Sequence, residues 1–97
     1  MSCAVVSSGE SSVIILPQEF TFNVRDDFRR FLSEKKSLYE VDFQHVEKID
    51  SAAFGMLLLL KENSKTKSAD VVLRNVKPEI LKMLQLVRFH ESFTIVS

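Results

Sequence analysis

The chain has 97 residues, of which 45% are hydrophobic, with thirteen basic and thirteen acidic side chains. This length fits one small domain over residues 1–97, and the formal net charge of zero argues against the basic surface that nucleic acid or anionic lipid requires. The single cysteine, Cys3, excludes an internal disulfide and suits a reducing compartment.

The chain also lacks the patterns of a secretory or membrane segment. Its beginning has no basic segment and no long apolar run, so it does not read as a secretory signal. The longest apolar stretch, 52–60, is much shorter than the roughly 20 residues that a membrane-crossing helix needs. We therefore expect a cytoplasmic protein without membrane insertion.

The first part of the chain predicts a hairpin followed by a helix. Residues 3–6 and 12–16 are rich in Val and Ile and flank a Ser- and Gly-containing turn, which is typical of two neighbouring strands. From 22 to 34, apolar residues mostly recur at three- and four-residue spacing and indicate an amphipathic helix, with Thr21 or Asn23 as its N-cap. The predicted apolar face of this helix consists of Phe22, Val24, Phe28, Phe31 and Leu32.

The remainder of the chain alternates strands and helices. Residues 38–43 alternate between apolar and polar side chains, as a half-buried strand does, and 44–49 is a short connection. A helix that is apolar nearly all round is expected from Ser51 to about Lys65, followed by a buried strand over 69–74.

The last two predicted elements are a helix and a strand. Pro78 suits the first turn of a helix over 78–86, because its missing N–H costs nothing there. Residues 93–96 indicate a closing strand. The predicted apolar face of the helix at 78–86 consists of Ile80, Leu81, Leu84 and Leu86.

This order of elements predicts an α/β sandwich. Strand–helix–strand crossovers make neighbouring strands parallel, whereas the leading hairpin is antiparallel. We therefore expect a mixed sheet of four to five strands packed with three to four helices.

No residue pattern indicates catalysis or metal binding. His45 and His90 are far apart in sequence and neither has a metal-type partner at helical spacing, and a chain with two glycines has no Gly-rich phosphate loop. Cys3 has no basic residue nearby that would activate its thiol. We expect structural roles for all three side chains, and a protein that is not an enzyme and has no metal or cofactor.

Asp50 and Ser51 stand where the connection becomes a helix. Either side chain can accept a hydrogen bond from the free N–H groups of the first turn, so an N-cap is the simplest interpretation. The small residues Ala52 and Ala53 would leave the Ser51 hydroxyl open to a kinase, and the positive end of the helix would stabilise a phosphoserine. A phosphorylation site at Ser51 is the alternative interpretation.

A known family has a similar motif. The Asp-Ser-Ser/Thr-Gly-Leu-Gly segment of bacterial anti-sigma factor antagonists, the single-domain members of the STAS family, resembles Asp50-Ser51-Ala52-Ala53-Phe54-Gly55-Met56. The resemblance extends over nearly the whole chain, and 21–24 and 55–60 are most similar to the proteobacterial branch. The chain departs from the family pattern at Ala52, where Ser or Thr is common, and at Ala53, where Gly is common.

The resemblance implies a partner-switching protein. In that family a cognate kinase, often the anti-sigma factor itself, phosphorylates the serine that follows the aspartate, and a phosphatase restores it. That serine corresponds to Ser51, and the aspartate to Asp50. The implied partners are an anti-sigma factor or serine kinase, which the unphosphorylated form binds and the phosphorylated form releases, and a cognate phosphatase. We expect transcription regulation as the output, no nucleic-acid partner, and a monomer in the free state.

A second function remains open at this point. Some STAS domains are non-switching subunits that dock on and stabilise an ATPase of a membrane transport assembly. In either case the helix after Ser51 has more apolar residues than one sheet-facing stripe can absorb, so some of Ala53, Phe54 and Met56 should face solvent, unless this is a core helix covered on both sides. The expected partner-binding residues are Asp50, Ser51, Ala52, Ala53, Phe54 and Met56.

Overall fold

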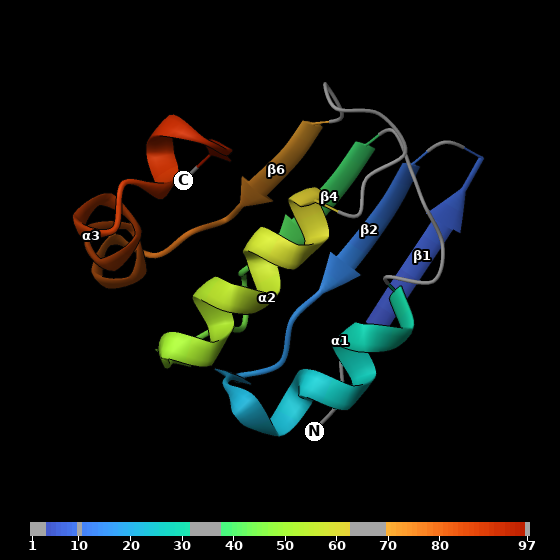
Figure 1. The fold of residues 1–97 in the computed structure, drawn as a ribbon, viewed down its shortest axis with the longest axis horizontal. Helices are drawn as coiled ribbons and strands as arrows, with labels where there is room; N and C mark the ends of the chain where they lie inside the picture. The colour runs from blue at the N-terminus through green and yellow to red at the C-terminus, as the bar shows by residue number, and fades with distance from the viewer. Residues whose placement is uncertain (1–3, 10, 32–37, 63–69, 97) are drawn as a thin grey trace.

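A five-stranded mixed sheet forms the centre of the computed structural model, which describes residues 4–9, 11–31, 38–62 and 70–96 (Figure 1). The first two strands in the sheet order pair antiparallel, and all other neighbours pair parallel. In sheet order the strands are β1 (Ala4–Ser8), β2 (Ser11–Ile15), β4 (Leu38–Asp42), β6 (Asp70–Arg74) and β7 (Thr94–Val96). The predicted mixed sheet and leading hairpin are confirmed.

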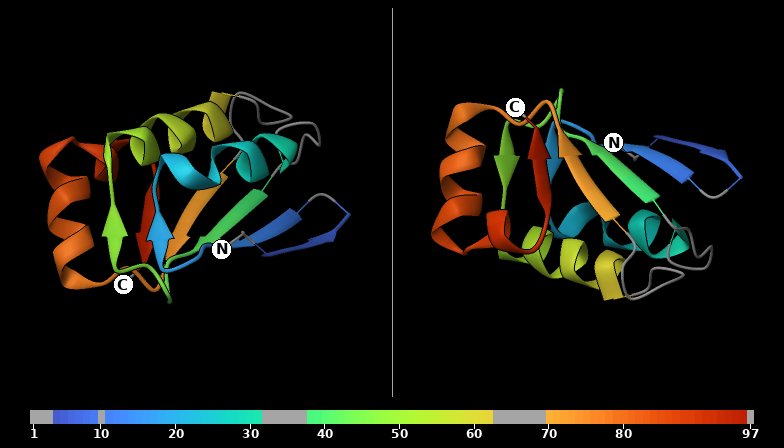
Figure 2. Two further views of the ribbon diagram at one scale, coloured as in Figure 1. Left: turned by 90° about the horizontal axis from the view of Figure 1, so that it is seen from below. Right: turned by 90° about the horizontal axis from the view of Figure 1, so that it is seen from above.

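The helices are distributed unevenly about the sheet. Helices α1 (Arg25–Phe31) and α2 (Ser51–Glu62) lie side by side on one face, and α3 (Pro78–Leu86) stands at the end of the molecule opposite the β1–β2 hairpin (Figure 2). Side chains on alternate positions of the central strands are buried beneath α1 and α2, as a half-covered sheet requires. The core that results includes Ile14, Tyr39, Val41, Leu73, Phe28, Leu57 and Leu60.

The connection predicted over 44–49 contains a short strand instead. β5 (Lys48–Ile49) pairs in parallel with β3 (Glu19–Phe20), a second strand absent from the prediction. The backbone N–H groups of Glu47 and Lys48 both donate to the carbonyl oxygen of Gln18, at 2.8 and 3.2 Å. A two-residue strand has too few positions to show a period, so the sequence pattern could not reveal it.

The helix predicted over 22–34 begins with a different geometry. A 3-10 turn, η1 (Phe22–Val24), precedes α1, and the Thr21 hydroxyl accepts a 3.4 Å hydrogen bond from the backbone N–H of Asn23, so Thr21 is the N-cap. Phe22, predicted in the apolar face, is 53% exposed and lies against the Arg25 guanidinium, 4.3 Å from the ring centroid. That part of the prediction is wrong.

The helix over 78–86 has the predicted bounds. Ile80 and Leu84 are buried and Leu81 is partly buried, but Leu86 is 83% exposed. Leu86 follows Leu84 by two residues, a rotation of about 200° around an α-helix, so it faces away from the core. The predicted ends of the helices at 34 and 65, and the predicted Leu32 and Cys3, fall outside the described residues.

Candidate functional site

Asp50 joins the start of α2 to the start of η1. One carboxylate oxygen, Oδ1, accepts a hydrogen bond from the backbone N–H of Ala53 at 3.2 Å. The other, Oδ2, accepts from the backbone N–H of Phe22 at 3.1 Å. Asp50 is therefore the N-cap of α2 and also holds the first residue of η1, and the β3–β5 pair brings the two segments together.

Ser51 is the first residue of α2, and its side chain is exposed. Since the Asp50 carboxylate already caps α2 by accepting from the N–H of Ala53, the Ser51 hydroxyl is not needed as a cap, and within the described residues it has no hydrogen-bond partner. The positive end of the helix dipole lies directly beneath it. Such a hydroxyl is open to a macromolecular enzyme, and a phosphate on it would meet a favourable local field.

The three α2 residues of which some were expected to face solvent differ in exposure. Ala53 and Met56 are 1% and 5% exposed and do not face solvent, so the expectation holds for Phe54 alone of the three. Both belong to the stripe that packs on the core together with Leu57 and Leu60. Phe54 is partly exposed and contacts Phe89 edge-on, with ring centroids 5.3 Å apart.

Other residues of α2 form its exposed apolar surface. Leu58 is 43% exposed and Leu59 is 50% exposed, so α2 is not a core helix covered on both sides. Gly55 is exposed as well, one turn beyond Ser51. The sequence reasoning missed Leu58 and Leu59, because in the run 57–60 four leucines stand in a row and only the spacing from a known buried residue distinguishes them.

A groove of about 320 Å³ lies between α1 and α2. Its α2 side begins with Ala52, directly after Ser51, and continues through Gly55 and Met56 to Leu59. Its α1 side consists of Arg25, Phe28 and Arg29. The groove therefore starts beside Ser51 and extends along the apolar surface of α2.

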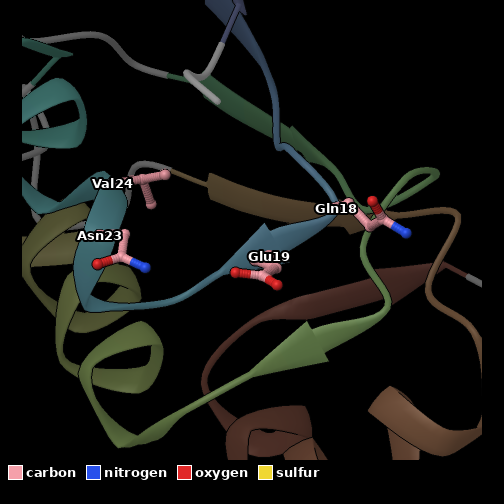
Figure 3. A pocket seen from close by; sticks show the side chains of 4 residues that line it. All are labelled: Gln18, Glu19, Asn23 and Val24. Carbon is pink, nitrogen blue, oxygen red and sulfur yellow. The ribbon is translucent and has the colours of Figure 1, made fainter.

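A smaller and more polar hollow lies beside η1 (Figure 3). It is lined by Gln18, which precedes β3, by Glu19 of β3, and by Asn23 and Val24 of η1. The Gln18 side-chain amide donates to the Glu47 carboxylate, which ties this rim to the segment before β5. Ser51 and the rest of the predicted site do not line this hollow.

The remaining candidates do not gather into a site. His45 and His90 are both exposed. In the described part of the chain, no three His, Cys, Asp or Glu side chains lie where they could hold a metal ion. Among the same residues, no helix is long and apolar enough to cross a membrane.

Comparison with known proteins places this geometry in a family. Residues 3–97 match the family model described as Mlab, STAS domain. The chain belongs to the STAS-domain family. This STAS domain is also 32% identical, over 92 residues, to a STAS-domain containing protein of Pseudomonas aeruginosa (strain UCBPP-PA14), an alignment that covers 92% of this chain and 91% of that protein.

Solved structures share the fold of this STAS domain. A putative anti-sigma factor antagonist from Thermotoga maritima has a TM-score of 0.81 at 14% identity, covering 98% of this chain and 86% of that chain. The Bacillus cell fate determinant SpoIIAA in its phosphorylated form has a TM-score of 0.75 at 17% identity, covering 98% and 91%. A sulfate transporter family protein from Wolinella succinogenes has a TM-score of 0.78 at 18% identity, covering 94% and 80%. Because both kinds of protein share the fold, the fold alone does not distinguish the two functions.

Proposed function

We propose that this STAS domain is an anti-sigma factor antagonist whose binding to a protein partner is controlled by phosphorylation of Ser51. The unphosphorylated chain binds an anti-sigma factor or a related serine kinase, and the phosphorylated chain releases it. The protein is then a ligand and a substrate of other enzymes rather than a catalyst.

One observation carries the proposal: Ser51 is exposed at the start of α2 while its neighbour Asp50 caps the helix. A serine that capped the helix would lose a stabilising hydrogen bond on phosphorylation, whereas Ser51 loses none within the described residues. The motif resemblance and the fold shared with SpoIIAA add support.

Phosphorylation changes the contact surface rather than the fold. A phosphate adds about −1.5 to −2 charges at neutral pH, at a helix end that favours anions. A partner carboxylate placed about 4 Å away, at an effective dielectric constant near 20, would then be repelled by roughly 4 kcal/mol per unit charge before screening. Half of that energy still corresponds to more than a tenfold loss of affinity.

The direct test is phosphorylation of the purified chain. Incubation with the serine kinase encoded nearest to its gene, and with ATP, should add the mass of one phosphate to the wild-type chain and none to Ser51→Ala. Peptide mapping should place the phosphate on Ser51. An unmodified wild-type chain, with a kinase shown to be active on another substrate, would argue against the proposal.

A second candidate is a subunit that docks on the ATPase of a membrane transport assembly. The fold shared with a sulfate transporter family protein favours it, as does Ala52, where antagonists commonly have Ser or Thr. This candidate predicts stable binding to an ATPase that Ser51→Asp leaves unchanged. Neighbouring genes for a transporter, rather than for a kinase and phosphatase, would support it.

A further inference from the structure

Apolar and cationic side chains line the groove between α1 and α2. The large apolar ones are Phe28 and Met56, both buried, and Leu59, which is 50% exposed. On the α1 side, Arg25 and Arg29 are exposed, and among the residues that the structure describes no carboxylate lines the groove. The acidic residues of α1, Asp26 and Asp27, are not part of the lining.

We propose that this groove binds an amphipathic helix of the protein partner that carries Asp or Glu beside its apolar side chains. The proposal rests on the proposed function and specifies the surface that the phosphate controls. Charge complementarity selects the occupant, because the two arginines, the charged residues among the described lining, attract an acidic segment and repel a basic one.

The dimensions of the groove fit a helix. Ala52, Gly55 and Leu59 span about two turns of α2, so a partner helix would present apolar side chains over a similar length. Ala52 and Gly55 have small or no side chains, and nothing lies within 4 Å of a Cβ built on Gly55, so a partner can approach the α2 backbone there. Arg25 and Arg29 are one helical turn apart, which matches two partner carboxylates at the same spacing.

The position of Ser51 couples the groove to the switch. Ala52 lines the groove and follows Ser51 directly, and the hydrogen bond from Phe22 to Asp50 keeps the start of η1 beside the start of α2. Arg25 follows η1 and shares the groove with Ala52. A phosphate on Ser51 would therefore add negative charge at the end of the groove, where it repels a partner carboxylate and competes for Arg25.

The test uses two synthetic helical peptides. Both have Leu along one face; one has Glu residues one turn apart beside that face, and the other has Lys at the same positions. Titration into the isotope-labelled full chain, followed by amide NMR, should give at least tenfold tighter binding of the Glu peptide, with the largest shifts at Ala52, Gly55 and Leu59. Equal binding of the two peptides, or shifts centred elsewhere, would overturn the proposal.

Variants of the chain make the test specific. Gly55→Phe fills the groove from a position with open space and should weaken the binding of the Glu peptide at least tenfold. The pair Arg25→Glu and Arg29→Glu should reverse the preference between the peptides, and Lys82→Glu, exposed on α3, should not. Thermal unfolding of each variant confirms that it is folded. An unchanged affinity in folded Gly55→Phe would exclude the groove.

The peptide experiment separates the two proposals. It needs neither a kinase nor the natural partner. Failure of the Glu peptide to bind would therefore reject the groove as the binding site without contradicting phosphorylation of Ser51. Conversely, if no kinase modifies Ser51 but the Glu peptide binds as expected, the groove is supported as a binding site and control by phosphorylation is rejected. If both proposals are correct, the Glu peptide should bind the chain phosphorylated on Ser51 at least tenfold more weakly than it binds the unmodified chain.

Discussion

Asp50 holds the backbone N–H of Phe22, 28 residues earlier in the chain, with a hydrogen bond of 3.1 Å. Its second oxygen caps α2 through Ala53, so one carboxylate fixes two helical starts. This arrangement leaves the neighbouring Ser51 free of a capping role. Asp50 makes the contacts that stabilise the two helix starts, and the Ser51 hydroxyl makes none of them.

Replacement of Asp50 by alanine should therefore destabilise the fold. The variant loses the α2 cap and the anchor of η1, and loss of an N-cap alone costs about 0.5–2 kcal/mol. Chemical unfolding should show a lower midpoint with little change in slope. Asp50→Asn keeps an acceptor oxygen and should lose less; equal midpoints for Asp50→Ala and the wild type would contradict the double role.

Changes at Ser51 should affect binding and leave stability nearly unchanged. Ser51→Ala should bind the anti-sigma factor or kinase constitutively, and Ser51→Asp, which adds one charge at an exposed helix start, should bind more weakly. Partner affinity and thermal midpoint should be measured in parallel for both variants and the wild type. If folded Ser51→Asp binds as tightly as Ser51→Ala, electrostatic release is wrong and the transport-subunit function is favoured.

The two glycines of the chain, Gly9 and Gly55, should respond in opposite directions to replacement by alanine. Gly55 lies inside α2 with open space around it, so Gly55→Ala should stabilise the protein by about 1 kcal/mol. Gly9 also has open space but a φ of +55°, so Gly9→Ala should destabilise it by roughly 1 kcal/mol. Thermal unfolding measures the midpoints of the two variants and the wild type. A lower midpoint for Gly55→Ala would contradict the open space around Gly55.

The leucine run of α2 offers another matched set. Leu57→Ala and Leu60→Ala remove side chains that are 1% and 0% exposed, and each should cost about 2–5 kcal/mol of unfolding free energy. Leu58→Ala and Leu59→Ala, at exposed positions, should each cost less than about 1 kcal/mol. Denaturant unfolding compares the four variants; similar losses at all four positions would contradict the orientation of α2.

Many elements of this fold follow from local sequence patterns. The structure confirms the predicted hairpin, the helix that begins at Ser51 and the helix over 78–86, and the strand predicted over 38–43 is present as Leu38–Asp42. Each has a period, a cap or a proline that depends only on nearby residues. The Asp50-Ser51 pair was predicted at a helix start for the same reason, and the structure places it there.

Other features of the fold and of the candidate site depend on contacts between segments that are distant in the sequence. The local pattern predicts where α2 begins but not which of its leucines are buried, because their burial depends on how the helix is rotated against the sheet. Asp50 and Ser51 were both possible caps, and the three-dimensional arrangement selects Asp50, which bonds Ala53 through one oxygen and, because the β3–β5 pair brings Phe22 close, Phe22 through the other. The groove beside Ser51 exists only because α1 packs next to α2, and no local period predicts the side-by-side packing of two helices that β4 and β5 separate in the chain.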